Sequence, residues 1–364
     1  MKFNELLHHG QSIWLDFISR SYIQQGTLGK YVNSGVRGVT SNPTIFEKAI
    51  NGSNDYDESI KILSRKGLSA EEIYDALVID DIRHAADTLL SVYEQSQGKD
   101  GYVSLEVSPQ FAHNTKKTVE QALEYVRAIL KPNIMIKVPA TQEGLPAITE
   151  LISHGINVNV TLMFSIRHFH DVADAYMTGL EKLLATGGTL SKVNSVASFF
   201  VSRVDTIYDG LLEKKGKSDL MGKAAVANSK LTYAEFQTLL QSDRWKALAA
   251  KGANVQRLLW ASTSTKNPSY PDTLYIDTLI GPHTVNTVPP NALQAFLHHG
   301  TASESVTKGV KEARTVIEQC AQLGISYEDA TEQLQKEGVA AFAKSFETLM
   351  GSIEEKRKRL AHAG

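Results

Sequence analysis

Short apolar runs rich in β-branched residues alternate with longer amphipathic segments along this chain. Eight such runs stand out, at residues 12–17, 36–41, 102–107, 133–139, 156–163, 193–200, 257–263 and 283–289. Their length and composition are typical of β-strands, most of them buried. Because strands that alternate with helices form parallel sheets, and eight such units close into a ring, the pattern predicts an α/β fold with a single (β/α)8 TIM barrel.

The segments between these runs have the periodicity of helices. Residues 115–130 contain apolar positions spaced three and four apart, which would share one helix face: Val119, Leu123, Val126 and Leu130. The stretches Ser69–Glu72 and Thr232–Glu235 each match a capping box, so we predict that a helix begins at both places.

The whole chain, residues 1–364, is expected to form one domain built on this barrel. The stretch between the sixth and seventh runs is longer than one crossover helix requires, so we predict a helical insertion around residues 210–250. The residues after the eighth run also have helical periodicity. We expect this C-terminal extension, around residues 301–364, to pack across the barrel.

Composition narrows the functional classes. The chain has 364 residues, 42% hydrophobic and 21% charged, and its net charge of −2 provides no overall field for nucleic acid or an anionic membrane. The stretch MKFNELLHHG lacks the apolar run of a signal peptide, and no stretch reaches the roughly 18 apolar residues of a membrane span. A single cysteine, Cys320, excludes an intrachain disulfide and is typical of a reducing compartment. We expect a cytoplasmic protein with no nucleic-acid or membrane partner.

The stretch NIMIKVPAT, residues 133–141, places a lysine inside a predicted buried strand. Side chains alternate along a strand, so Ile136 and Val138 would face the helices and Lys137 would face the barrel axis. The same alternation turns a set of polar side chains toward the axis, most of them near the carboxyl ends of their strands: Asp16, Thr40, Asn42, Glu106, Lys137, Asn159 and Thr161. Because (β/α)8 barrels build their active sites at that end, we expect these residues to form one site.

Lys137 is open to two interpretations. As a structural cation, it would pair with Asp16 or Glu106, because a buried ammonium requires a partner. As a nucleophile, it would have a pKa lowered by burial, and its neutral amine would attack a ketone to give a carbinolamine and then an iminium. The iminium withdraws electrons, so the neighbouring carbon–carbon bond can break or form. Asp16 and Glu106 would move the protons, and Thr161 would hold a water beside Glu106.

Longer motifs around these residues resemble those of the transaldolase family. GVTSNPTIFEKAI, residues 38–50, is similar to the family's N-terminal signature, and NIMIKVPAT is similar to its Schiff-base lysine strand. LEVSP, NVNVTLMFS, ASFFVSR and WASTSTKNP follow in the family's order, so the resemblance extends from about Asp16 to Pro290. VANSKLTYAEF, DTLYIDTLIG and HTVNTVPP resemble the longer branch of the family found in some bacteria.

The resemblance implies a role for each residue of the predicted site. Lys137 would form the Schiff base with the C2 carbonyl of a ketose phosphate. Asp16 would exchange the proton of the C4 hydroxyl, and Glu106 would move protons through a water that Thr161 also holds. The other residues would bind the dihydroxyacetone unit or lie at the same substrate site: Thr40, Asn42, Asn159 and Ser198.

Two further features concern the substrate phosphate and the type of reaction. The resemblance implies that Arg203 binds the phosphate, which suits a guanidinium. Some family members carry a second arginine after the seventh strand; here Ser264 aligns with it, and Lys266 is the other candidate to complete the phosphate site. Phe200 would lie in the substrate site near the catalytic water. A tyrosine there would activate water and release the donor unit, so phenylalanine favours a transferase.

We therefore expect an enzyme that needs no cofactor and no metal. It would transfer a dihydroxyacetone unit from sedoheptulose 7-phosphate to glyceraldehyde 3-phosphate, giving erythrose 4-phosphate and fructose 6-phosphate, a reaction of the pentose phosphate pathway. Two alternatives stay open: a Schiff-base aldolase that releases free dihydroxyacetone from fructose 6-phosphate, and a non-catalytic barrel that binds sugar phosphates. The partners would be sugar phosphates, and the protein would be a monomer or a homodimer.

Overall fold

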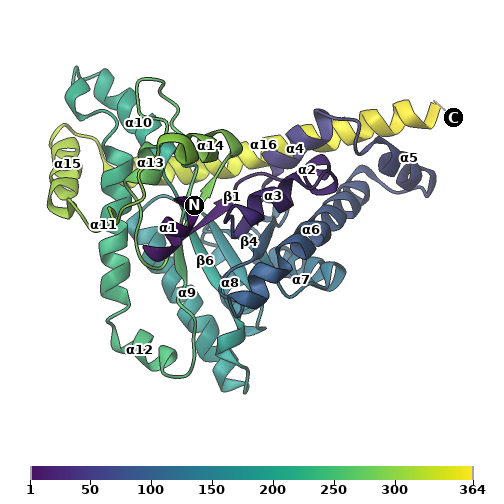
Figure 1. Ribbon diagram of the computed structural model, residues 1–364, viewed down its shortest axis with the longest axis horizontal. Helices are drawn as coiled ribbons and strands as arrows, with labels where there is room; N and C mark the ends of the chain where they lie inside the picture. Colours follow the sequence, from purple (N-terminus) through teal and green to yellow (C-terminus); the bar gives the residue numbers. More distant parts are fainter. Residues whose placement is uncertain (1, 363–364) are drawn as a thin grey trace.

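The computed structural model describes residues 2–362 and contains eight parallel strands that close into a barrel in chain order (Figure 1). The strands are β1 Gln11–Leu15, β2 Gly38–Thr40, β3 Tyr102–Glu106, β4 Ile134–Pro139, β5 Val158–Met163, β6 Ser195–Phe200, β7 Arg257–Ala261 and β8 Thr284–Val288. Each coincides within a few residues with one of the eight apolar runs. The predicted (β/α)8 barrel is therefore confirmed.

Helices surround the barrel and follow the strands along the chain. They are α1 Lys2–His8, α2 Arg20–Gln24, α3 Thr27–Asn33, α4 Pro43–Asn51, α5 Asp57–Arg65, α6 Ala70–Gln95, α7 Thr115–Ile129, α8 Gly144–Ser153, α9 Ile166–Ala185, α10 Ser202–Glu213, α11 Ala224–Leu239, α12 Asp243–Ala249, α13 Leu274–Asp277, α14 Pro290–His299, α15 Val310–Gln322 and α16 Tyr327–His362, with short 3-10 helices η1 Pro109–Phe111, η2 Leu190–Lys192 and η3 Ser218–Leu220. Within residues 2–362, no helix has both the length and the apolar character needed to cross a membrane.

Two helix predictions need correction. Helix α7 is present; Val119 is buried and Leu123 and Val126 are partly buried against the core, as predicted, whereas Leu130 ends the helix in a left-handed conformation and is 79% exposed. The chain turns away at that residue, so its side chain cannot follow the helical spacing.

The capping box at Ser69 is confirmed, because its hydroxyl accepts from the Glu72 amide and Glu72 accepts from the Ser69 amide. The one predicted at Thr232 is wrong. Thr232 lies inside α11, and its hydroxyl donates to the carbonyl of Asn228 one turn earlier. A threonine hydroxyl that bonds back within a helix gives the same local sequence as a cap, so the pattern alone did not separate them.

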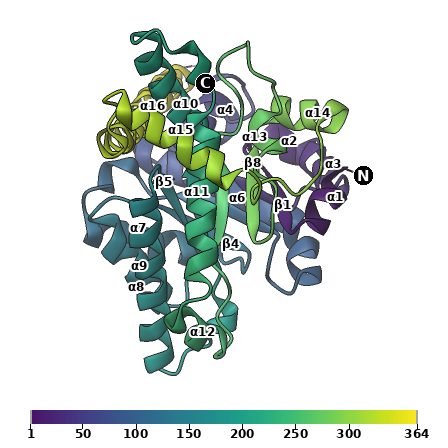
Figure 2. The same cartoon turned by 90° about the vertical axis from the view of Figure 1, so that its left-hand side faces the viewer.

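The segments outside the barrel pattern are helical. Helices α11 and α12 lie between β6 and β7, and α15 packs on α11 at one side of the molecule (Figure 2). Helix α16 has 36 residues, so it is about 54 Å long. It packs against α4, α5, α6 and α10 and reaches the end of β5, and its C-terminal part extends past α5 (Figure 1). The predicted crossing of the barrel by the C-terminal segment is therefore present.

The barrel register brings polar positions of neighbouring strands to one level. Glu106 of β3 pairs with Lys137 of β4, and Lys137 pairs with Asn159 of β5. Side chains at paired positions of parallel strands point the same way. Three residues separated by up to 53 positions in the chain thus become adjacent.

An ionic network around a buried carboxylate lies at the opposite, N-terminal end of the barrel. Asp100, just before β3, accepts hydrogen bonds from Trp14 Nε1 at 2.9 Å, from Arg37 Nε at 3.0 Å and from Arg257 Nη2 at 3.2 Å. The Ser12 hydroxyl donates to the same carboxylate. Every group in this network has a partner of opposite charge or a hydrogen bond.

Candidate active site

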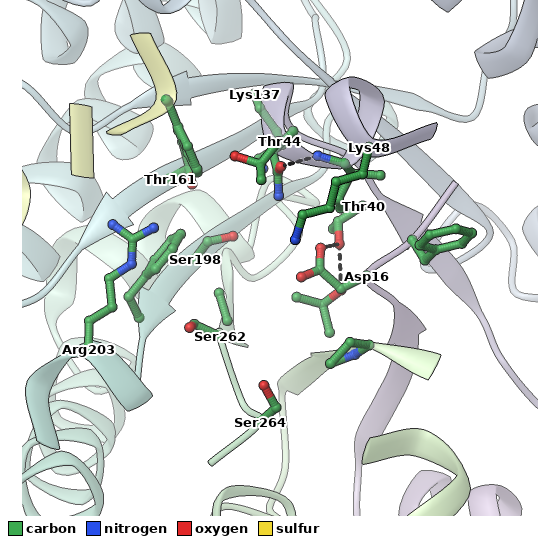
Figure 3. A pocket seen from close by; sticks show the side chains of 18 of the residues that line it. Asp16, Thr40, Thr44, Lys48, Lys137, Thr161, Ser198, Arg203, Ser262 and Ser264 are labelled. Atoms are coloured by element: carbon green, nitrogen blue, oxygen red, sulfur yellow. Dashed lines mark hydrogen bonds between the residues drawn. The ribbon is translucent and has the colours of Figure 1, made fainter. Parts of the chain in front are cut away.

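A cavity of about 390 Å³ opens at the carboxyl ends of the strands (Figure 3). Ten residues singled out in the sequence line it: Asp16, Thr40, Asn42, Lys137, Thr161, Ser198, Phe200, Arg203, Ser264 and Lys266. They come from strands β2, β4, β5 and β6, from helix α10 and from loops after β1, β2 and β7. Two predicted residues, Glu106 and Asn159, lie behind the cavity wall.

Lys137 projects from β4 into the cavity and is only 4% exposed. Its Nζ donates a hydrogen bond to the carbonyl of Ser41 at 2.9 Å, and it lies 3.2 Å from Oε2 of Glu106. Of the two carboxylates considered as partners for this amine, the structure places Glu106 in contact. The pair has the geometry of a structural ion pair and also that of a nucleophile beside a base, so the surrounding groups must decide between them.

Burial raises the pKa of both carboxylates. For Glu106, desolvation raises the pKa, and the charge of Lys137 opposes this rise. For Asp16, desolvation likewise dominates, against a 2.7 Å hydrogen bond donated by Thr40 and the charges of Lys137 and Lys266. A carboxylate with a raised pKa accepts a proton more readily near neutral pH, which suits general acid–base catalysis. Both carboxylates are therefore candidates for proton exchange.

Hydroxyl and amide groups complete the wall beside Lys137. Thr161 Oγ1 is buried and has no hydrogen-bond partner among residues 2–362. Asn159 is fully buried; its carbonyl oxygen accepts from Ser198 at 2.7 Å, and its amide donates to Ser104 at 3.1 Å. Asn159 thus fixes Ser198 at the cavity instead of presenting its own surface there. A buried hydroxyl without a partner is unusual and marks Thr161 as a place for a ligand or a water.

Asn42 serves the local fold as well as the cavity. Its side-chain oxygen accepts from the Ile45 amide at 2.9 Å and caps helix α4, which begins with Pro43. An asparagine at the N-cap followed by proline is a strong helix start. The cap leaves the amide nitrogen of Asn42 available at the cavity wall.

Arg203 lies on the opposite side of the cavity from Asp16 (Figure 3). The guanidinium carbon of Arg203 lies 5.4 Å from the ring centre of Phe200 and 5.8 Å from that of Phe342. Among residues 2–362 this guanidinium has neither an ion pair nor a hydrogen bond, and burial lowers its pKa. Lys266 Nζ donates to Ser264 Oγ at 3.0 Å at the rim of the cavity. Cations held this way are suited to an anionic group of a ligand.

A family model described as transaldolase/fructose-6-phosphate aldolase matches residues 13–353 of this chain. The chain belongs to this family. A curated relative named transaldolase from Trichodesmium erythraeum is 47% identical and aligns over 98% of this chain and 97% of its own length. A relative named transaldolase 2 from Nostoc sp. is 46% identical over 98% of both chains, and a transaldolase from Saccharopolyspora erythraea is 47% identical over 95% of both.

The site of this family member includes residues that sequence reasoning missed. They line the same cavity and are Phe17, Thr44, Lys48, Ser262, Thr287 and Phe342, among others. Lys48 carried a usable signal, because it lies four residues after Thr44 in a helix that starts at the cavity. Phe342 carried none, because no local pattern reports which distant helix covers a barrel mouth. Among residues 2–362, no group of three or more His, Cys, Asp or Glu side chains is arranged to hold a metal ion.

Proposed function

We propose that this chain is a transaldolase that moves a dihydroxyacetone unit from sedoheptulose 7-phosphate to glyceraldehyde 3-phosphate through a Schiff base on Lys137. The products would be erythrose 4-phosphate and fructose 6-phosphate. The observation that carries the proposal is the buried Lys137 amine, which faces the cavity 3.2 Å from Glu106. The relatives named transaldolase support the same reaction.

Glu106 is positioned to prepare the amine. Because burial raises the pKa of Glu106, this carboxylate can take a proton from the Lys137 ammonium. The neutral amine attacks the C2 carbonyl, a carbon–nitrogen bond forms, and the carbonyl oxygen takes a proton from the attacking nitrogen to become a hydroxyl. Protonated Glu106 then supplies the proton with which that hydroxyl leaves as water, and Thr161 Oγ1 provides a free hydrogen-bonding group for that water. The result is an iminium on Lys137.

Asp16 is positioned for the carbon–carbon step. Asp16 takes the proton of the C4 hydroxyl, and the C3–C4 bond breaks. The electron pair of that bond moves into the iminium to give an enamine, and the aldehyde leaves. The enamine then attacks the acceptor aldehyde, and Asp16 returns the proton to the new hydroxyl. Its raised pKa and the Thr40 hydrogen bond support this exchange.

Charge balance supports a phosphorylated substrate. Four cations line the cavity, Lys48, Lys137, Arg203 and Lys266, and Asp16 is the carboxylate that lines it. Glu106 pairs with Lys137 behind the wall, and the charge of Glu337 in α16 also acts on Arg203. The excess of positive charge among the lining residues suits an anionic group such as a phosphate monoester. We assign phosphate binding to Arg203 and Lys266, with Lys48 as an exposed cation at the rim.

Phe200 supports transfer over release of free dihydroxyacetone. It lines the cavity and packs against Phe164, with ring centres 5.3 Å apart. A phenylalanine has no hydroxyl with which to direct a water at the enamine, so the donor unit stays bound until an aldehyde arrives.

The first test is borohydride trapping. The protein is incubated with fructose 6-phosphate, reduced and digested, and the peptide that contains Lys137 is weighed by mass spectrometry. We expect a reduced dihydroxyacetone adduct on Lys137 and none in Lys137→Met. Sugar binding without an adduct would indicate a non-catalytic barrel. Free dihydroxyacetone formed at the same rate without an acceptor aldehyde would indicate an aldolase.

A further inference from the structure

One face of helix α16 lies against the mouth of the barrel. Gln335, Gly338, Phe342 and Ser345 are spaced three and four residues apart, so they share this face. Gln335 Nε2 donates to the carbonyl of Ala140, just after β4, at 2.9 Å, and to the carbonyl of Leu162 in β5 at 3.1 Å. At the other end, the hydroxyls of Ser345 and Thr44 are 2.8 Å apart. The helix is thus fixed across the strand ends that carry Lys137 and Thr161.

Between these anchors, the helix meets Arg203. A Cβ atom on Gly338 would lie 3.2 Å from Arg203 Nη1 and 2.8 Å from Leu162 Cδ2, so only glycine allows this approach without displacing a neighbour. One turn later, Phe342 covers the guanidinium on one side, while Phe200 covers another. Glycine inside a helix is less favourable than alanine, because its backbone loses more conformational freedom on folding. Gly338 allows the close contact with Arg203, although glycine is unfavourable for the helix itself.

The guanidinium held there has no ionic partner among residues 2–362. A free arginine side chain has many rotamers, and the loss of rotamer entropy when it becomes ordered opposes binding. The rings of Phe200 and Phe342 and the backbone of α16 restrict the Arg203 side chain before a ligand arrives. Because the side chain is already in place, less conformational entropy is lost on binding.

We propose that Gly338 and Phe342 of α16 position Arg203 for the substrate phosphate and thereby set the preference for phosphorylated over unphosphorylated aldehydes. The inference rests on the proposed function, which assigns Arg203 to the phosphate. It makes a helix more than 120 residues away from Arg203 in the chain a determinant of specificity.

The test compares Gly338→Ala and Phe342→Leu with two matched controls in the same helix. Gly351→Ala introduces a Cβ with no atom within 4 Å, and Phe346→Leu changes a buried ring that packs on Tyr74, outside the cavity. For each protein, kcat/KM is measured for glyceraldehyde 3-phosphate and for glyceraldehyde, with fructose 6-phosphate as donor. The acceptor meets only the enamine form, so its kcat/KM does not depend on donor binding.

We expect the value for glyceraldehyde 3-phosphate to fall about tenfold in Gly338→Ala and in Phe342→Leu, and the value for glyceraldehyde to stay within about twofold. Both controls should keep the wild-type preference. In an Arg203→Ala background, Gly338→Ala should change the preference no further, because its effect acts through Arg203. A purely structural role would lower both values together.

The inference is overturned if neither variant changes the preference, or if the change persists in Arg203→Ala. Failure of the proposed function looks different, because wild-type protein would then give no transfer and no adduct on Lys137. If Gly338→Ala does not fold, Phe342→Leu alone decides the matter, since it removes ring atoms and adds no steric conflict.

Discussion

The two ends of this barrel both contain buried charges, and they differ in whether their arginines have ionic partners. At the N-terminal end, Asp100 accepts hydrogen bonds from two arginines and from the indole N–H of Trp14. At the C-terminal end, Arg203 has no ionic partner and Thr161 no hydrogen bond among residues 2–362. The N-terminal end even borders a larger cavity, of about 540 Å³. The paired arginines are suited to holding the fold, whereas the arginine without a partner is available to an anionic ligand.

Strand β1 and its continuation contribute side chains to both ends of the barrel. Ser12, Trp14 and Asp16 share the axis-facing side of β1 and its continuation, because their positions differ by two. Ser12 and Trp14 donate to Asp100, whereas Asp16 lines the active-site cavity. The alternation pattern is the same for all three, so only their surroundings distinguish the ionic network from the proposed catalytic site.

The sharpest test of this comparison is Asp16→Asn. We expect kcat to fall about 10²- to 10⁴-fold, because the general acid–base group is lost while Lys137 still forms the Schiff base. Burial raises the pKa of Asp16, so the ionised form opposes folding at neutral pH, and the variant should be at least as stable as wild type. Steady-state kinetics, borohydride trapping and urea unfolding measure the three quantities. Normal turnover would remove Asp16 from the mechanism.

The matched substitution at the other end, Asp100→Asn, should have the opposite profile. It leaves Arg37 and Arg257 without their carboxylate, and breaking a buried ion pair costs about 3–5 kcal/mol of unfolding free energy. At low temperature, where the variant is still folded, kcat should stay within about twofold of wild type. Asp174→Asn, which removes an exposed partner of Arg244, is the control and should change neither quantity measurably. A loss of kcat in folded Asp100→Asn would contradict the division of roles.

Asp205 offers an intermediate case, a buried carboxylate with hydrogen bonds but no cation. It accepts from Tyr275 Oη and from the Ala225 amide, both at 2.7 Å, and burial raises its pKa to about 6. The folded state thus binds this proton more tightly than the unfolded state. The unfolding free energy should fall by at most about 3 kcal/mol as pH rises from about 4 to 6. Above pH 6, titration of Asp205 should change it little. Urea unfolding of wild type and Asp205→Asn across this range measures the difference, and parallel curves would disprove the prediction.

The smallest effect is expected for Lys266→Met at the cavity rim. The KM for sugar phosphates should rise about fivefold, since an exposed cation contributes modestly. The charge of Lys266 lowers the pKa of Asp16, so its removal should also move the acid limb of the kcat–pH profile to higher pH. Lys251→Met, an exposed lysine in the loop before β7, is the control for lost charge. If both variants behave alike, Lys266 has no specific role at the site.

The sequence by itself determined the barrel, because eight buried strands and their amphipathic helices each carry a local hydrophobic period. It also placed Lys137, Asp16 and Thr161 toward the axis, since strand alternation is a local rule. It did not predict that Asn159 would lie behind the wall, bonded to Ser198, because alternation gives a direction and no depth. It placed Thr232 at a helix start when the residue lies inside α11.

Only the tertiary structure decided which charges are paired and what covers the barrel mouth. Asp16 and Asp100 are similar carboxylates in the sequence, and the packing of distant segments alone gives the second its two arginines. Phe342 and Gly338 reach Arg203 because α16 crosses the strand ends, a contact between residues far apart in the chain. Local periodicity records which face of an element is buried. It contains no information on which other element meets that face, and that meeting determines the chemistry.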